Sequence, residues 1–370
     1  MGGWRATDGE GVITIGELGE FGLIAAITQR MAAAAGGSGS ADEGRVILGA
    51  GDDAAVIEAP DRRVVATADM LLEGRHFRRD WSSAADVGHK AAARNLADVA
   101  AMGAVPTALL VCFAGPPTLA VDWVLELAEG IAAECAGVGA QVAGGDTSNA
   151  DTVLLAITAF GDLVRRAPVT RSGARPGDVV AIAGTLGSAA AGLDLLRANT
   201  ETDADGALAG LVRAHRRPSP PYAAGWQAAQ LGATSMIDVS DGLIGDLGHV
   251  AQASGVRCEL DSARLGAEPI ARVSALRQAA AQLSGNAGGP QWLRWVLTGG
   301  DDHALAATFP PDVALPSTWT VVGTVEKGHG IAVDGQNWSD AGGWEHFRTL
   351  LPSVNDRFLS VMLRPGKGLI

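Results

Sequence analysis

Apolar residues in this chain follow two alternating spacings, one typical of helices and one typical of short strands. Leu18, Phe21, Ile24 and Ile27 recur at helical intervals, which predicts a helix over residues 16–31. The same criterion predicts helices over residues 84–102, 119–138, 222–231 and 243–253. Short apolar runs predict strands over residues 45–48, 64–68, 107–113, 141–143, 153–160, 179–183 and 235–237. Strands and helices that alternate in both halves indicate an α/β (α+β) protein of two domains.

The composition changes between residues 163 and 177, where arginines and prolines gather, and we place the domain boundary there. The expected segments are a disordered leader (1–15), an N-terminal domain (16–163), a C-terminal domain (164–350) and a loosely ordered tail (351–370). The boundary arginines have two interpretations, a solvated linker or a phosphate clamp. Because a guanidinium presents a planar fork that suits phosphate oxygens, Arg171 is a candidate ligand for phosphate.

Six short segments place aspartates beside glycine or other small residues near the ends of predicted elements. The first is Gly49–Ala55, which follows the apolar run Val46–Leu48 and contains the adjacent carboxylates Asp52 and Asp53. The others are residues 67–69, 95–98, 144–147, 238–242 and 299–302. One Asp-Gly turn is ordinary loop chemistry. Six of them suggest one site built from distant segments, and its carboxylate oxygens would suit Mg²⁺.

Two of these segments also have purely structural interpretations. Asp98 stands four residues after Arg94, a spacing that allows a surface ion pair on a helix, as it does for Asp86 and Lys90. Residues 238–242 precede a predicted helix, where Asp or Ser commonly acts as the N-cap. A cap needs only one polar residue, and this segment has three.

Charge and cysteine content narrow the class of protein. The chain has 370 residues and a formal net charge of −13, which argues against a basic face for nucleic acid. An acidic protein that binds phosphates would need metal cations between the charges. The three cysteines stand at scattered spacings, which fits a reduced cytoplasmic protein. No secretory signal pattern and no apolar run of about 20 residues occurs, so we expect no membrane span.

Common catalytic motifs are absent from the sequence. It contains no GxGxxG, no Walker GxxxxGK[ST], no HExxH and no GxSxG. A glycoside hydrolase needs two carboxylates rather than six glycine-flanked clusters. Several aspartates with a few arginines fit phosphoryl transfer, in which catalysis is positioning plus charge neutralisation by Mg²⁺.

Ten short motifs follow one another between residues 16 and 350. They are residues 19–21, 51–55, 67–69, 73–77, 95–104, 144–147, 171–174, 238–243, 299–302 and 343–347. Their order resembles that of the thiamine-monophosphate kinases, which are related to aminoimidazole ribonucleotide synthetase and selenophosphate synthetase. The resemblance implies the two-domain aminoimidazole ribonucleotide synthetase-like fold. In it the N-terminal sheet domain forms a homodimer, the C-terminal α/β domain packs against that domain, and ATP lies in the cleft between them.

The resemblance also implies a reaction and its ligands. The γ-phosphoryl group of ATP would pass directly, in line, to thiamine monophosphate and give thiamine diphosphate, assisted by several Mg²⁺ ions. The implied metal ligands are Asp52, Thr67, Ala68 through its carbonyl, Asp69, Asp98, Asp146, Asp238 and Asp241. The implied ATP contacts are Gly145, Asp146, Arg171 and Ser240. The implied contacts to the thiamine moiety are His76, Asp301 and Trp344.

Trp344 could hold the cationic thiazolium ring by cation–π attraction, or it could be a packed surface tryptophan. The family usually has Glu where Asp301 stands, so this carboxylate is shorter by one methylene. No general base is evident, and a phosphate acceptor that is already largely ionised needs none.

Two other functions remain open on the sequence alone. One is an ATP-dependent cyclo-ligase of the aminoimidazole ribonucleotide synthetase type, and the other is a catalytically silent nucleotide-binding subunit. A selenophosphate synthetase would need a reactive Cys near the N-terminus, and no cysteine precedes Cys112.

Overall fold

A computed structural model describes residues 12–34, 45–49, 54–202, 205–268, 270–284 and 291–338. Asp52 and Trp344 lie outside these residues, as do residues 1–11 and 339–370.

Helix α1 (Ile15–Leu18) is capped by Thr14, whose side chain accepts from the Glu17 backbone while the Glu17 side chain accepts from the Thr14 backbone. Helical structure therefore begins at Ile15, one residue before the predicted start.

The N-terminal half contains a four-stranded sheet in the order β3-β6-β4-β5. Its strands are β3 (Val65–Leu72), β4 (Val105–Gly115), β5 (Gln141–Asn149) and β6 (Leu154–Asp162). Strand β6 is antiparallel to β3 and to β4, whereas β4 and β5 are parallel. The parallel pair needs a crossover connection, which is supplied by α4 (Val121–Gly137). Strands β1 (Val46–Leu48) and β2 (Val56–Ile57) form a separate two-stranded antiparallel sheet.

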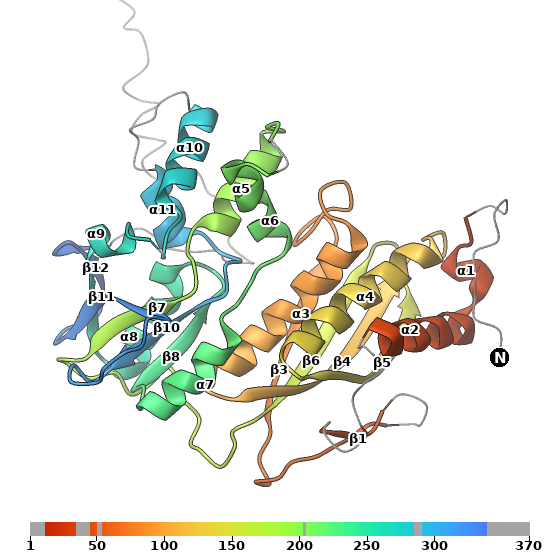
Figure 1. Cartoon of the computed structure of the whole chain (residues 1–370), viewed down its shortest axis with the longest axis horizontal. Coiled ribbons are helices and arrows are strands. Elements are labelled where there is room, and N and C mark those ends of the chain that lie inside the picture. Colours follow the sequence, from red (N-terminus) through yellow and green to blue (C-terminus); the bar gives the residue numbers. More distant parts are fainter. Residues whose placement is uncertain are drawn as a thin grey trace, which may run out of the picture.

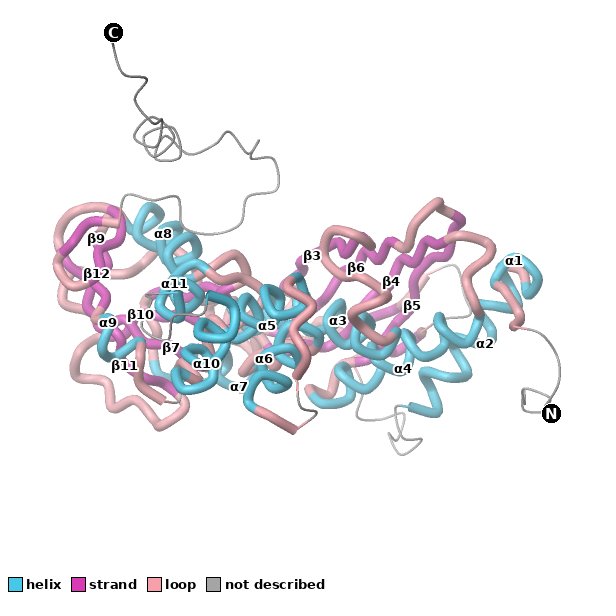
Figure 2. The backbone as a smooth tube through the Cα atoms, turned by 90° about the horizontal axis from the view of Figure 1, so that it is seen from above, coloured by secondary structure: helices cyan, strands magenta, loops and turns pink. Residues whose placement is uncertain are grey.

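Helices cover one face of this sheet. Helices α2 (Glu20–Ala34), α3 (Ala84–Ala101) and α4 lie together on one side of the strands (Figure 1, Figure 2). Two glycines let α3 and α4 pack closely, because a Cβ at Gly88 would lie 2.0 Å from the Leu127 carbonyl oxygen and one at Gly130 would lie 2.2 Å from that of Ala85. On the opposite face, β3 exposes Ala66, Ala68 and Met70.

The C-terminal half contains a seven-stranded sheet in the order β13-β12-β9-β11-β7-β10-β8. Its strands are β7 (Val179–Ala183), β8 (Ser235–Val239), β9 (Arg257–Leu260), β10 (Ala304–Phe309), β11 (Trp319–Glu326), β12 (Gly330–Val333) and β13 (Gln336–Asn337). Only the β9–β12 pair is parallel. Both sheets are therefore mixed, and the molecule is of the α+β kind within the predicted class.

Helices pack on both faces of the second sheet. Five of them contribute to its larger core: α5 (Ser188–Arg197), α6 (Ala207–Arg216), α8 (Leu243–Ser254), α10 (Val273–Ser284) and α11 (Gln291–Thr298). The short helix α9 (Ser262–Leu265) adds Leu265 to the same core. Helix α7 (Tyr222–Leu231) covers the other face, where Ala224 and Ala228 pack with Met236 and Phe309.

The smaller core extends across the two halves. Ala101 of α3 belongs to the same cluster as α7 and the second sheet. A Cβ at Gly225 of α7 would lie 2.0 Å from the Ala100 carbonyl oxygen of α3, so the two helices approach closely. Helix α3 therefore packs against its own sheet and against the other half of the molecule.

Most predicted elements occur, with altered ends. Strands β3 and β5 extend further than predicted, so Asp69 and residues 144–147 lie within strands rather than after them. Helix α6 was not predicted. No helix in the described part of the chain is long and apolar enough to cross a bilayer.

Candidate functional site

The first part of the site is built from β3 and α3. Side chains alternate along a strand, so Thr67 and Asp69 point toward α3 while Ala68 points to the exposed face. The Thr67 hydroxyl donates to Asp98 Oδ2 at 2.8 Å. The Asp69 backbone N–H donates to Asn95 Oδ1 at 3.0 Å, which fixes the strand against the helix.

The two ion pairs considered within α3 do not form. Arg94 donates to Asp69 Oδ2 at 3.3 Å and to Asp301 Oδ1 at 3.1 Å, not to Asp98. Lys90 contacts Asp301 rather than Asp86, whose carboxylate caps the helix start. The i,i+4 rule describes exposed helix faces. Most of α3 is buried, so its cations find their partners on other elements.

The second part of the site consists of two interlocked loops in the C-terminal half. The Asp301 N–H donates to the Ser240 carbonyl at 2.8 Å, and the His303 N–H donates to the Val239 carbonyl at 2.9 Å. The His303 ring, which is 1% exposed, places Nδ1 3.2 Å from Asp238 Oδ2. Asp238 and Ser240 are thereby held next to residues 301–303.

The N-cap interpretation of residues 238–242 is wrong. Helix α8 starts after Gly242 without a side-chain cap from that residue. Asp246, inside the first turn, accepts instead from the Asp241 and Gly242 N–H groups at 3.0 Å each. Burial, followed by the charges of Asp238 and Asp241, raises the Asp246 pKa to about 8.

The two adjacent aspartates at 301 and 302 have different roles. Asp302 is buried and accepts from the Gly187 and Ala189 N–H groups at 2.6 and 2.9 Å, at the start of α5. Burial raises its pKa to about 7. Asp301 faces α3 instead, where Lys90 Nζ donates to its Oδ2 at 2.9 Å.

Asp301 is held in an unusual backbone conformation. Its φ is +67°, and that of His303 is +53°, a region that residues other than glycine rarely adopt. Burial disfavours the charged carboxylate of Asp301, but the positive charges of Lys90 and Arg94 outweigh this and hold its pKa well below the usual range. The site thus keeps an ionised carboxylate at the junction of the two halves.

The carboxylates at this junction repel one another. Burial, together with the charges of Asp238 and Asp69, raises the Asp98 pKa to about 7. The excess negative potential and the oxygen donors fit a hard divalent cation such as Mg²⁺. In the described residues, however, no three His, Cys, Asp or Glu side chains are already arranged as a metal cluster.

Not all implied residues meet at this junction. Gly145 and Asp146 lie on β5, at the opposite edge of the sheet from β3. Three strand spacings separate these edges, which is about 14 Å. A Cβ at Gly145 would lie 1.8 Å from the Val111 carbonyl oxygen, so the sheet requires glycine there. Both residues border an apolar cavity of about 980 Å³ between α2, α4 and β5.

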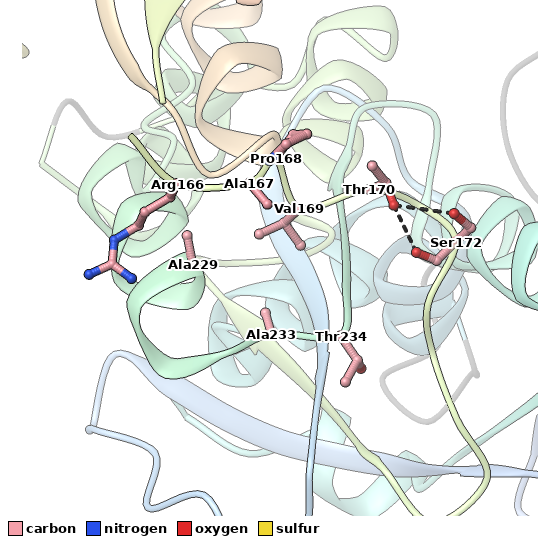
Figure 3. Close-up of a pocket in the computed structure, with 9 residues that line it drawn as sticks. All are labelled: Arg166, Ala167, Pro168, Val169, Thr170, Ser172, Ala229, Ala233 and Thr234. Carbon is pink, nitrogen blue, oxygen red and sulfur yellow. Dashed lines mark hydrogen bonds between the residues drawn. The ribbon is translucent and has the colours of Figure 1, made fainter. Parts of the chain in front are cut away.

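His76 and Arg171 lie on loops at separate places. His76 Nδ1 accepts from the Leu72 N–H at 3.0 Å, which leaves the proton of a neutral ring on Nε2. Arg171 is exposed, and Ser254 Oγ donates to its carbonyl at 3.2 Å. Near it, where the two halves connect, a pocket of about 550 Å³ contains the Thr170 and Ser172 side chains, which point toward each other (Figure 3).

The sequence interpretation missed the site role of Lys90 and Arg94. Its signal was present, because two cations four residues apart lie on one face of a helix. The sequence did not indicate which element packs against this face of the helix.

The chain is similar in sequence and structure to a group of known proteins. Residues 51–163 match the family model of the AIR synthase related protein, N-terminal domain. The chain is 43% identical over 335 residues to the thiamine-monophosphate kinase of Mycobacterium tuberculosis H37Rv. The aligned region covers 90% of this chain and 93% of the relative. It resembles the crystal structure of the thiamine-monophosphate kinase from Stenotrophomonas maltophilia K279a, with a TM-score of 0.72, 31% identity and coverage of 85% and 97%. It also resembles AaThiL complexed with AMPPCP and TMP, with a TM-score of 0.70, 30% identity and coverage of 90% and 98%.

Proposed function

The chain belongs to the thiamine-monophosphate kinase family, and from this premise we propose how its residues carry out the family's reaction. The enzyme transfers the terminal phosphoryl group of ATP to the phosphate of thiamine monophosphate, giving thiamine diphosphate and ADP. The observation that carries the assignment of the site is the meeting of Asp69, Asp98, Asp238 and Asp301 at the junction of the two halves.

We assign the metal site to the carboxylates on the β3 and α3 side and on the β8 loop. The proposed Mg²⁺ ligands there are Thr67, Ala68 through its carbonyl, Asp69, Asp98, Asp238 and Asp241. Asp52, which lies outside the described residues, and Asp146, at the opposite edge of the first sheet, are proposed as further Mg²⁺ ligands. Bound Mg²⁺ would neutralise charge on two polyanionic substrates. The raised pKa of Asp98 supports this assignment. Burial is its largest cause, and the charges of Asp238 and Asp69 add a repulsion that a cation would relieve.

We assign nucleotide contacts to Gly145, Asp146, Arg171 and Ser240, and acceptor contacts to His76, Asp301 and Trp344. Asp301 is ionised and lies beside the loop that carries Ser240, so an acceptor bound there would lie next to one of the proposed nucleotide contacts. The acceptor phosphate has a second pKa of about 6 and is largely ionised at neutral pH. The transfer therefore needs positioning and charge neutralisation rather than a strong general base.

A turnover assay tests this proposal. Purified protein, Mg²⁺, ATP and thiamine monophosphate should give thiamine diphosphate and ADP in equal amounts, and EDTA should stop the reaction. Free thiamine in place of thiamine monophosphate should give no product. ADP formed only with a formylglycinamidine ribonucleotide would instead indicate the cyclo-ligase, and nucleotide binding without any turnover would indicate the silent subunit.

We also propose that the enzyme works as a homodimer in the cytoplasm. The face of the first sheet opposite the helices exposes Met70 at 54%, with Ala66 and Ala68 beside it on β3 and Cys112 on β4. An apolar sheet face without a covering helix is typical of an interface. Cys112, Cys135 and Cys258 are all free thiols, which suits a reducing compartment.

Met70→Glu should therefore convert the dimer into a monomer. The substitution places a charge on the proposed interface, where it would have to be desolvated on association. Sedimentation velocity at micromolar concentration measures the result. Val164→Glu is the matched control, since Val164 is exposed at 42% but lies on the connection between the halves. A Met70→Glu protein that sediments like the wild type would exclude this face as the interface.

A further inference from the structure

Arg94 joins the proposed metal site to the proposed acceptor site, because it contacts Asp69 and Asp301. Its side chain is 12% exposed, and its guanidinium contacts carboxylates from both halves of the molecule. Nε donates to Asp69 Oδ2 at 3.3 Å, and Nη1 donates to Asp301 Oδ1 at 3.1 Å. Asp69 is itself fixed, because its backbone N–H is bound by Asn95 on the same helix as Arg94.

The other oxygen of Asp301 is held by a cation with a different anchor. Lys90 Nζ donates to Asp301 Oδ2 at 2.9 Å and to the His215 carbonyl of α6 at 3.2 Å. Lys90 lies on α3, so it ties both Asp301 and α6 of the C-terminal half to this helix. Arg94 lies on the same helix and is the cation that ties Asp301 to Asp69 of β3.

The backbone alone does not set the direction of the Asp301 carboxylate. The N–H of Asp301 is bound to Ser240, and φ is +67°. These contacts fix the main chain, whereas χ1 and χ2 are fixed by Lys90 and Arg94. A planar guanidinium can bind two carboxylates at once with defined geometry, which a lysine ammonium on its flexible stem does less well.

We propose that Arg94 is a positioning residue for the acceptor. It holds the Asp301 carboxylate at a fixed place relative to Asp69, so that an acceptor bound to Asp301 presents its phosphate to the metal-binding end of the site. The inference rests on the proposed function, because it takes Asp301 as an acceptor contact. Arg94 itself acts through Asp301 and does not contact the acceptor phosphate.

Calorimetric binding tests this role without catalysis. The titrants are thiamine monophosphate and free thiamine, each added to the protein with saturating Mg²⁺ and AMPPCP and again without either. Arg94→Met removes the charge and keeps the aliphatic stem, and Arg94→Lys keeps the charge without the fork. The control is Arg30→Met, which removes a half-exposed ion pair between α2 and α4.

Arg94→Met should lower the affinity for thiamine monophosphate and for free thiamine by the same factor, about tenfold. Both titrants would contact Asp301, and only thiamine monophosphate carries a phosphate. Arg94→Lys should recover part of the loss. Arg30→Met should bind as the wild type does. Combined with Asp301→Asn, Arg94→Met should add no further loss, since the group that it positions is already altered.

Other outcomes would overturn the inference. Loss of affinity for thiamine monophosphate alone would show that Arg94 contacts the phosphate directly, and unchanged affinity for both would remove it from the acceptor site. If Arg94→Met fails to fold, Arg94→Lys alone and Arg94→Lys combined with Asp301→Asn still test the inference. If the wild-type protein binds neither titrant, the proposed function falls together with the inference. If the wild-type protein binds both titrants and Arg94→Met binds them with the same affinity, the inference alone is overturned.

Discussion

Asp98→Asn should abolish most of the phosphoryl transfer and at the same time make the metal-free protein more stable. The loss of turnover should be about a hundredfold or more, because a metal ion supplies several kcal/mol of charge stabilisation and about 1.4 kcal/mol corresponds to a factor of ten. The gain in stability follows from the surroundings of Asp98. Burial and the charges of Asp238 and Asp69 raise its pKa from 3.8 to about 7 in the folded protein.

The sign of the pH dependence identifies this cause. A carboxyl whose pKa is raised on folding disfavours the folded state once it ionises, so stability is lost as pH rises from about 4 to about 7. The amide of Asn does not ionise and can still accept from Thr67. In urea titrations with EDTA, the variant should match the wild type near pH 4 and exceed it by about 1–3 kcal/mol at pH 7.5, allowing for solvent screening.

Asp69→Asn is the matched control for this experiment. It should also lose turnover, but it should not gain stability, because Asp69 forms an ion pair with the largely buried Arg94. Normal turnover in Asp98→Asn would exclude Asp98 from the metal site. A less stable Asp98→Asn protein at pH 7.5 would show that its charge is compensated rather than repelled.

Gly225→Ala should destabilise the protein and reduce its activity, although Gly225 lies in the middle of helix α7. In an open helix this change would stabilise by about 1 kcal/mol. Here the new Cβ would lie 2.0 Å from the Ala100 carbonyl oxygen, so α7 and α3 must move apart. Overpacking of this kind costs about 1–3 kcal/mol, which outweighs the gain in helix propensity.

The loss of activity should be the more informative result. Helix α3 carries Lys90, Arg94 and Asp98, and its distance from α7 sets their position relative to the C-terminal loops. Gly248→Ala is the control, because a Cβ at this position of α8 meets nothing within 4 Å. That variant should be more stable than the wild type and fully active. A Gly225→Ala protein with the wild-type melting temperature and KM values would mean that the two helices accommodate the methyl group without moving.

The sequence predicted the segments of the candidate site but not the contacts between them. The aspartate motifs could be found because carboxylates beside glycines are hard to explain by packing alone. Their pairing depended on tertiary packing, so the two ion pairs that the i,i+4 spacing allowed within α3 do not form. Arg94 and Lys90 have the correct spacing for those pairs, but burial of the helix gave them partners 207 and 211 residues away.

Local rules failed in a similar way at α8. The polar residues 238–242 fit an N-cap pattern, and the capping oxygen comes instead from Asp246, four residues into the helix. Helix α6 was missed, although it supplies the His215 carbonyl that binds Lys90. Strand β7 and helix α7, by contrast, were predicted with the correct ends, because turn residues bound them on both sides.

The core that α3 shares with the second sheet limits how the protein can be divided. A fragment that ends at Leu163 would leave Ala100 and Ala101 without α7, and the complementary fragment would expose the alanines of α7 to water. Neither piece should be soluble by itself, while the two produced together should reassemble. Chimaeras between relatives should therefore exchange α3 and α7 as one unit, even though Tyr222, where α7 begins, lies 121 positions after Ala101, where α3 ends.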